Sequence, residues 1–164
     1  MKPQPLLIDT NLLILFVVGT ASREYIEKHK KLSHFIAKDY DTLVRIISNA
    51  PSVLVTPNTL TETSNLAACI GEPARGEVLE TLRTIADTCS EVYIPSKLAA
   101  SRKEFLRLGL TDSAVLCAIS GEVMLLTADL DLYLAAVAVG DAAVNFRYCP
   151  DGVLVSDIVL LDTQ

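Results

Sequence analysis

The chain has 164 residues, a hydrophobic fraction of 51% and a formal net charge of −6. A chain of this length fits one domain with a substantial buried core, and this composition is unlike that of a disordered protein. The negative charge argues against a protein that coats nucleic acid through a broad basic surface. It does not exclude a nuclease, because acids that bind divalent cations reverse the local field.

The cysteines and the first apolar run indicate the compartment. The four cysteines lack C-x-x-C spacing, and no histidines are placed to complete a zinc site, so we predict free thiols in a reducing cytoplasm. The seven apolar residues of 12–18 are at the lower limit for a signal peptide, and we interpret them as the first buried element of the fold. No run reaches the roughly 18 apolar residues that cross a bilayer, so we expect a cytoplasmic protein without a membrane partner.

The predicted elements alternate between apolar runs of strand length and stretches of helical periodicity, which is typical of βαβ units. Within 22–48 the spacing predicts two helices, the second capped by Asp39 or Asp41. The first elements in chain order are a strand at 6–8, the two helices within 22–48, a strand at 53–55, a helix from 58 or 59 to 67, a helix around 78–86, a strand at 92–94 and a helix over 98–108.

The last third of the chain gives the clearest pattern. Its predicted elements are a helix opened by Thr111 and Asp112 that reaches 119, a strand at 123–126, a helix over 130–139, and two β-rich runs at 143–148 and 153–161. No repeat, linker or low-complexity segment interrupts the chain. We therefore expect a single domain over residues 1–164 with parallel strands.

Four acidic residues that are far apart in sequence follow or open these elements. Asp9 lies just past the first strand, and Asp129 just past the strand that ends at Thr127. Glu62 lies one turn into a predicted helix, and Asp112 opens another. Because ligands bind where the carboxyl ends of parallel strands meet, we expect these four side chains to point into one small volume.

A cluster of four carboxylates favours a bound cation. Such groups repel one another and raise each other's pKa unless a cation neutralises them. Oxygen ligands suit Mg²⁺ or Mn²⁺, whereas the lack of well-placed His and Cys argues against zinc. One or two such ions generate hydroxide from water and stabilise charge on a scissile phosphate.

The segments around these acids resemble the PIN domain nucleases in order and spacing, over residues 5 to 148. The four segments are Leu-Ile-Asp9-Thr10-Asn11-Leu-Leu, Thr-Glu62-Thr-Ser-Asn65-Leu, Leu-Thr-Asp112-Ser-Ala and Leu-Leu-Thr127-Ala-Asp129. The resemblance implies a three-layer α/β/α sandwich with a central, mainly parallel sheet. It also implies a metal-dependent endoribonuclease that cleaves RNA. The family includes the VapC-type toxins, so an antitoxin protein is an expected partner.

The resemblance assigns roles to individual residues. It implies that the catalytic, metal-binding acids are Asp9, Glu62, Asp112 and Asp129. Asn11 and Thr127 match the polar positions beside the first and last acids, and are expected to orient a carboxylate or a metal-bound water. Each acid also has a simpler interpretation, as a turn residue, a helix cap or a solvated surface group.

Three further features have both a functional and a simpler interpretation. Asp131 is either a fifth ligand or a solvated acid, and Asn65 shares a helix face with Glu62 as either a substrate contact or a surface residue. Lys28, Lys30 and Lys31, with His29 and His34 nearby, form either a solvated helix face or a patch that guides phosphates. The apolar excess and the C-terminal run predict a homodimer or partner surface.

The chain departs from the most compact VapC-type toxins, and two alternative functions remain open. The stretch 19–50 is longer than in those toxins, and Ala128 stands where an arginine is common. A catalytically silent PIN-like interaction module is one alternative, although loss of an acid is expected to mark it and all four are present. A phosphoryl-transfer domain using Asp9 is the other; Asn11 in place of an aspartate, and the lack of any lysine after Lys103, count against it.

Overall fold

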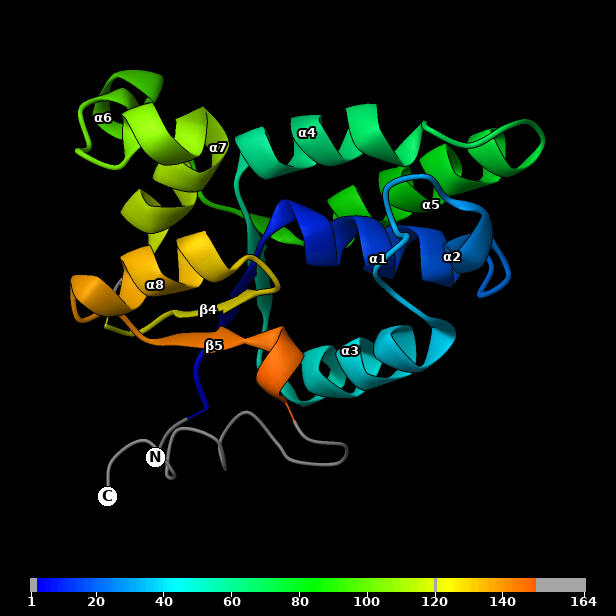
Figure 1. Cartoon of the computed structure of the whole chain (residues 1–164), viewed down its shortest axis with the longest axis horizontal. Coiled ribbons are helices and arrows are strands. Elements are labelled where there is room, and N and C mark those ends of the chain that lie inside the picture. The colour runs from blue at the N-terminus through cyan, green and yellow to red at the C-terminus, as the bar shows by residue number, and fades with distance from the viewer. Residues whose placement is uncertain (1–2, 120, 150–164) are drawn as a thin grey trace.

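The structure, a computed structural model that describes residues 3–119 and 121–149, is built on a parallel sheet (Figure 1). Within the described residues the sheet has five strands in the order β3-β2-β1-β4-β5, and every neighbouring pair is parallel. The strands are β1 (Leu6–Ile8), β2 (Val53–Val55), β3 (Ser90–Glu91), β4 (Met124–Thr127) and β5 (Ala143–Asn145).

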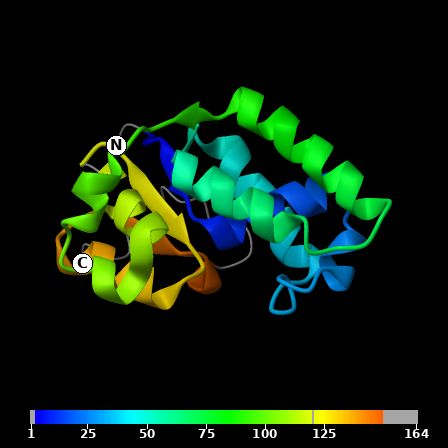
Figure 2. The same ribbon diagram turned by 90° about the horizontal axis from the view of Figure 1, so that it is seen from above.

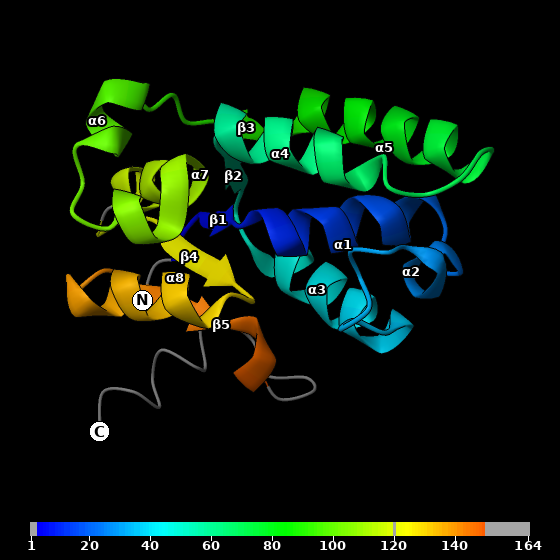
Figure 3. The same cartoon turned by 45° about the horizontal axis from the view of Figure 1, so that its top comes forward.

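Helices cover both faces of this sheet (Figure 3). They are α1 (Thr10–Ala21), α2 (Tyr25–Lys28), α3 (Ala37–Asn49), α4 (Pro57–Ala67), α5 (Ala74–Thr88), α6 (Ser96–Ala100), α7 (Phe105–Ala118) and α8 (Leu130–Ala138), and a 3₁₀ turn, Phe146–Tyr148, follows β5. Leu7 and Leu125 of the sheet pack with α7 and α8, whereas Leu6, Ile8 and Leu126 pack with α1, α3 and α5. The predicted α/β/α sandwich is therefore confirmed.

The apolar run 12–18 forms the centre of α1, which is the most buried helix of the fold. Leu12, Leu13, Leu15 and Val17 are all fully buried. Figure 2 shows α4 and α5 side by side against α1, so this helix is enclosed by other helices as well as by the sheet. A helix that is apolar all round belongs in such a position, and the interpretation of the run as a buried element is confirmed.

Gly19 lies where α1 meets α3, and we predict that it tolerates no side chain. A Cβ on Gly19 would overlap the ring of Tyr40 on α3. That ring stacks on Phe16, with centroids 6.5 Å apart, and its hydroxyl lies 3.2 Å from Thr20 Oγ1, so it is held in place. We expect Gly19→Ala to lower the free energy of unfolding by about 1–3 kcal/mol, measured by urea denaturation.

Gly76 provides the matched control for this substitution. It lies on the exposed face of α5, where a Cβ would meet only a carboxylate oxygen of Glu72 at 3.4 Å. Alanine is the better helix former, so Gly76→Ala is expected to stabilise the protein by about 0.5–1 kcal/mol. If the two alanine variants unfolded at the same urea concentration, the close approach at Gly19 would carry no energetic weight.

The strands at 6–8 and 53–55 are confirmed, and the strand after α5 differs from the prediction. This strand, β3, occupies Ser90–Glu91 instead of 92–94. Its partner β2 ends at Val55 because Thr56 turns the chain into α4 by accepting a hydrogen bond from the Thr59 amide at 3.1 Å. Beyond Glu91, one further backbone hydrogen bond joins this segment to β2 among the described residues, from Val92 N to the Val55 carbonyl.

The helix predicted over 98–108 is wrong as a single element. The structure has α6, a turn, and α7, and the buried Glu104 carboxylate pairs with Arg102 at 3.1 Å in that turn. Gly109, with φ of 83°, then breaks α7 internally, so the helical run that contains Asp112 starts anew just before Thr111. The prediction that a helix opens near Thr111 is thus correct, although α7 continues before it.

The remaining predictions divide between confirmed elements and adjusted boundaries. The second helix within 22–48 is α3, and Asp39 Oδ2 accepts the Ile36 amide at 2.8 Å, as expected for a cap. The run 143–148 is a strand only as far as Asn145, whose side chain accepts the Arg147 amide at 3.0 Å and starts the 3₁₀ turn. The predicted run 153–161 lies outside the described residues.

Two findings relate to the predicted compartment. Across residues 3–119 and 121–149, no helix combines the length and apolar character that crossing a bilayer requires. The four cysteines are free thiols, and each is partly buried.

Candidate carboxylate site

The four predicted acids surround the carboxyl ends of β1 and β4 at the centre of the sheet. Chain connections run outward from β1 through β2 to β3, then return to the other side of β1 as β4 and β5. The strand order therefore reverses between β1 and β4, and ligands of open α/β sheets bind in the crevice at such a point. Asp9 follows β1 directly, and Asp129 lies two residues past β4.

Asp9 is a buried carboxylate that joins the two central strands. Its side chain is 2% exposed. One oxygen caps α1 by accepting the Leu12 amide at 2.9 Å, and the other accepts the Ala128 amide at 3.0 Å together with the Thr127 hydroxyl. Burial raises the pKa of Asp9, and these hydrogen bonds oppose the rise. Asp9 is consequently fixed in position by both β1 and the segment after β4.

Thr127 links Asp9 to Asp129 through a single hydroxyl. This hydroxyl donates to Asp9 and accepts the Asp129 amide at 2.9 Å. Asp129 caps α8, with one carboxylate oxygen accepting the Leu132 amide at 3.0 Å. The amino ends of α1 and α8 thus both face this edge, where their dipoles favour negative charge.

Glu62 approaches the site from α4. The hydroxyl of buried Thr10 donates to Glu62 Oε2 at 3.2 Å, which connects the first turn of α1 with α4. Thr10 was not among the predicted site residues, although it stands inside the first motif. Its neighbour Asn11 is exposed, and no hydrogen bond joins Asn11 to an acid among the described residues. Thr10 is therefore the residue beside Asp9 that orients a carboxylate among the described residues, and a role of Asn11 towards a metal-bound water stays a prediction.

Asp112 brings the fourth carboxylate from α7. It is half-buried, and its pKa is raised to about 7 by burial and then by the negative charges of Asp129, Asp9 and Glu62. Charges act on a titration in this way only at short range, because solvent and salt screen distant groups. The four acids, which come from four different elements, therefore share one electrostatic environment.

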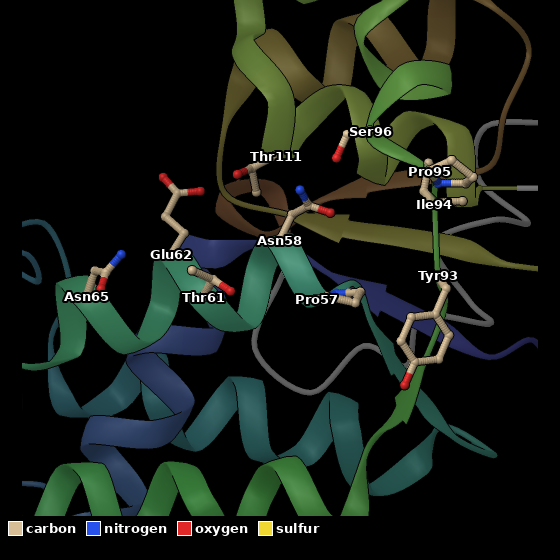
Figure 4. Close-up of a pocket in the computed structure, with 10 residues that line it drawn as sticks. All are labelled: Pro57, Asn58, Thr61, Glu62, Asn65, Tyr93, Ile94, Pro95, Ser96 and Thr111. Atoms are coloured by element: carbon tan, nitrogen blue, oxygen red, sulfur yellow. The ribbon is translucent and has the colours of Figure 1, made fainter.

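Asp131 and Asn65 lie at the margins of this cluster. The Asp131 side chain is 72% exposed and pairs with Arg107 of α7 at 3.5 Å, and it does not contribute to the raised pKa of Asp112. Asn65 is exposed one turn after Glu62 and lines a pocket of about 570 Å³ between α4 and the segment that leads into α6. Figure 4 shows Glu62 and Asn65 on the same side of α4, with Thr111 of α7 across from them.

The chemistry of the donor set fits a hard divalent cation, although the carboxylates do not enclose one. No three His, Cys, Asp or Glu side chains in the described part of the chain are grouped closely enough to surround an ion. Mg²⁺, however, keeps several water ligands and is commonly held by only one or two carboxylates. Burial, and then the charges of Asp129, Asp9 and Glu62, raise the pKa of Asp112 to about 7, so a cation at the cluster would favour its ionised form. One or two of Asp9, Asp112 and Asp129 would hold a cation at this edge, with water in its remaining coordination positions, and Glu62 lies to the side.

The predicted basic cluster is only partly a surface feature. His29 is buried, its Nε2 lies 3.1 Å from the Ala67 carbonyl, and its Nδ1 accepts the Lys31 amide at 3.2 Å. Burial lowers the pKa of His29, so this ring does not add positive charge at neutral pH. The three lysines are exposed, but only Lys28 is helical, because α2 ends there and a loop follows. The interpretation as a solvated helix face is therefore wrong for Lys30 and Lys31.

No protein-family model matches the chain, and no curated protein shows significant sequence similarity to it. The assignment of function therefore rests on the site itself.

We predict that the Thr127 hydroxyl is needed for the stability of the site. Thr127→Val keeps the shape of the side chain but leaves the Asp129 amide without its partner, so we expect a loss of about 1–3 kcal/mol in the free energy of unfolding. Thr127→Ser retains the hydroxyl and is expected to lose less. Urea denaturation of the three proteins in EDTA measures both effects. Equal stability of the valine variant and the wild type would contradict this role.

Proposed function

We propose that this protein is a Mg²⁺- or Mn²⁺-dependent endoribonuclease of the PIN type that hydrolyses RNA phosphodiester bonds. The observation that carries the proposal is the meeting of Asp9, Glu62, Asp112 and Asp129, which come from four different elements, at the carboxyl ends of the central strands. Burial and these neighbouring carboxylates raise the pKa of Asp112 to about 7. Four acids gathered at one end of a sheet repel one another and destabilise a protein unless a cation compensates their charge. A cation held there could also stabilise the charge on a scissile phosphate.

Each acid has a distinct part in this proposal. A bound cation supplies hydroxide from water and stabilises charge on the scissile phosphate. Asp9, fixed by its three hydrogen bonds, and Asp129, fixed by Thr127 and by the cap of α8, hold the cation in a defined place. Asp112 faces them from α7 and would contribute a further carboxylate to the cation. Glu62, held by Thr10, completes the negative wall on the α4 side.

The surroundings of the cluster suit a polymeric substrate. Glu62 lines the pocket next to α4, and Asp129 lines a second groove next to α8. A strand whose scissile phosphate lies at the acids can therefore continue into a depression on either side. The resemblance of the four motifs to PIN nucleases supports RNA as the substrate. The antitoxin partner, the homodimer and the cytoplasmic location stay predictions from the sequence.

No specific observation favours the phosphoryl-transfer alternative, which would need Asp9 as the nucleophile. Asn11 stands in place of a second aspartate, and no lysine follows Lys103 in the sequence. The proposal of a silent interaction module finds no specific support either, since all four acids are present and interact.

The test is cleavage of a mixed RNA pool by the purified protein in Mg²⁺, in Mn²⁺ and in EDTA. We expect internal cleavage with either ion and none in EDTA, and restoration when the ion is returned in excess. A matched DNA pool, treated in the same way, tests the choice of RNA. Absence of cleavage with both ions, in a protein whose unfolding transition shows it to be folded, would overturn the proposal.

A further inference from the structure

A second groove, of about 380 Å³, adjoins the carboxylate cluster on the α8 side. It lies between the loop after α2, the first turn of α8 and the 3₁₀ turn after β5. Its lining residues used below are Asn11, Lys31, His34, Phe35, Asp129 and Arg147. Asp129 belongs both to this groove and to the carboxylate cluster, so the two sites are continuous.

Basic side chains gather on one wall of this groove, in a chain whose net charge is −6. Lys31 and His34 come from the loop before α3, and Arg147 comes from the turn after β5, more than a hundred positions later in the sequence. All three side chains are exposed. Lys31 and Arg147 are positively charged, so this acidic protein brings two cationic side chains from distant parts of the sequence to one groove.

Arg147 is held ready for a ligand by two contacts. Its Nη1 donates to the His34 carbonyl at 3.0 Å, and its guanidinium carbon lies 4.2 Å from the centroid of the buried Phe35 ring. A guanidinium that is stacked and tethered in this way loses little further freedom on binding, and its remaining donors match the oxygens of a phosphate. No carboxylate pairs with Arg147 among the described ion pairs, so its charge stays available.

The opposite wall does not cancel this charge. Asp131 also lines the groove, but its carboxylate pairs with Arg107. One carboxylate oxygen of Asp129 caps α8 by accepting the Leu132 amide. The charge of Asp129 therefore lies where the groove meets the carboxylate cluster. Lys31 and Arg147 therefore remain without a described carboxylate partner in the groove, next to the negative cluster.

We propose that this groove binds a backbone phosphate of the RNA strand next to the scissile one, through Arg147 and Lys31. The inference rests on the proposed function and deepens it, because it assigns the direction in which the substrate strand leaves the acids. Arg147 contacts the phosphate through its fork of donors, and Lys31 acts as a point charge. This arrangement also explains how an acidic protein holds a polyanion beside four carboxylates.

The test separates binding from cleavage. Binding of a short labelled oligouridylate is measured by fluorescence anisotropy in EDTA, where no cleavage is expected, over a series of salt concentrations. The variants are Arg147→Gln and Lys31→Gln, and each has a matched control with the same charge change: Arg83→Gln on exposed α5, and Lys30→Gln beside the groove. Thermal unfolding of every variant shows whether the fold is kept.

We expect Arg147→Gln and Lys31→Gln each to weaken binding about ten-fold, and the controls to weaken it little. Each groove variant should also reduce the slope of log affinity against log salt by about 0.7, the value for one phosphate contact on a single strand. Arg147→Lys keeps the charge but loses the fork and the stack, and is expected to lie between wild type and Arg147→Gln.

The outcomes distinguish this inference from the proposed function. If groove variants and controls weakened oligonucleotide binding equally, only net charge would matter. The assignment of the groove as a phosphate site would then be wrong, even if the wild type cleaves RNA with Mg²⁺. Selective weakening by Arg147→Gln and Lys31→Gln, in a protein that never cleaves, would support the groove and overturn the nuclease.

Discussion

Replacing Asp112 by asparagine is expected to abolish metal-dependent RNA cleavage while making the metal-free protein more stable. The cleavage rate should fall on the order of 10³-fold, because the cation loses a ligand that contributes several kcal/mol to charge stabilisation. The free energy of unfolding in EDTA should rise by about 1–3 kcal/mol, because the raised pKa of Asp112 reflects an unfavourable charge that asparagine removes. Initial cleavage rates and urea denaturation measure the two effects on the same preparations.

Asp131→Asn is the matched control for this experiment. It makes the same chemical change on an exposed side chain whose only described ion pair, with Arg107, lies at the surface. Surface pairs of this kind contribute little, so both the cleavage rate and the stability should stay close to wild type. A destabilised Asp112→Asn protein, or an equal loss of cleavage in Asp131→Asn, would contradict the proposed division between the cluster and its margin.

The second large effect is a dependence of stability on pH that a divalent cation removes. Asp112 titrates near its ordinary value of 3.8 when unfolded and at about 7 when folded, so the folded protein binds the proton more tightly. In EDTA, stability should therefore fall as the pH rises from about 4 to about 7, by about 2–3 kcal/mol, and then level off. Burial of Asp9 raises its pKa and acts in the same direction.

A bound cation should reverse this loss. Mg²⁺ interacts with the ionised carboxylates, so its stabilising effect should be absent near pH 4 and largest above pH 7. Urea denaturation across this range, in EDTA and in excess Mg²⁺, gives both curves. In Asp112→Asn the EDTA curve should be flatter. The lowered pKa values of His29 and Glu104 act in the opposite direction, so the effect of Asp112 is the difference between the two proteins. Identical pH dependence of wild type and Asp112→Asn in EDTA would show that the four acids do not interact as the structure places them.

The sequence predicts the central strands well, because β1, β2 and β4 are buried on both faces and read as short, continuous apolar runs. It predicts the edge of the sheet less well. β3 is displaced because its length depends on where β2 turns into α4, and β5 is shortened because Asn145 caps a turn. The ends of β3 and β5 are set by contacts with other parts of the fold, which the local pattern of apolar residues does not reveal.

In the candidate site, too, some features were predictable from the sequence and others were not. The placement of Asp9 and Asp129 follows from one rule, that parallel strands end at a common edge, so the sequence alone suffices for them. The hydrogen bond from Thr10 to Glu62 joins residues 52 positions apart, and that from Arg147 to His34 joins residues 113 apart. No motif or spacing connects such pairs before the chain is folded.

The bridge that Thr127 makes between β1 and β4 leads us to expect slower hydrogen exchange in the half of the site that it joins. The Leu12 and Ala128 amides, which bond to Asp9 inside the core, should exchange their hydrogens with solvent only when the whole protein unfolds. The Asp112 segment begins after the break at Gly109 and takes no part in this bridge, so we expect its amides to exchange faster.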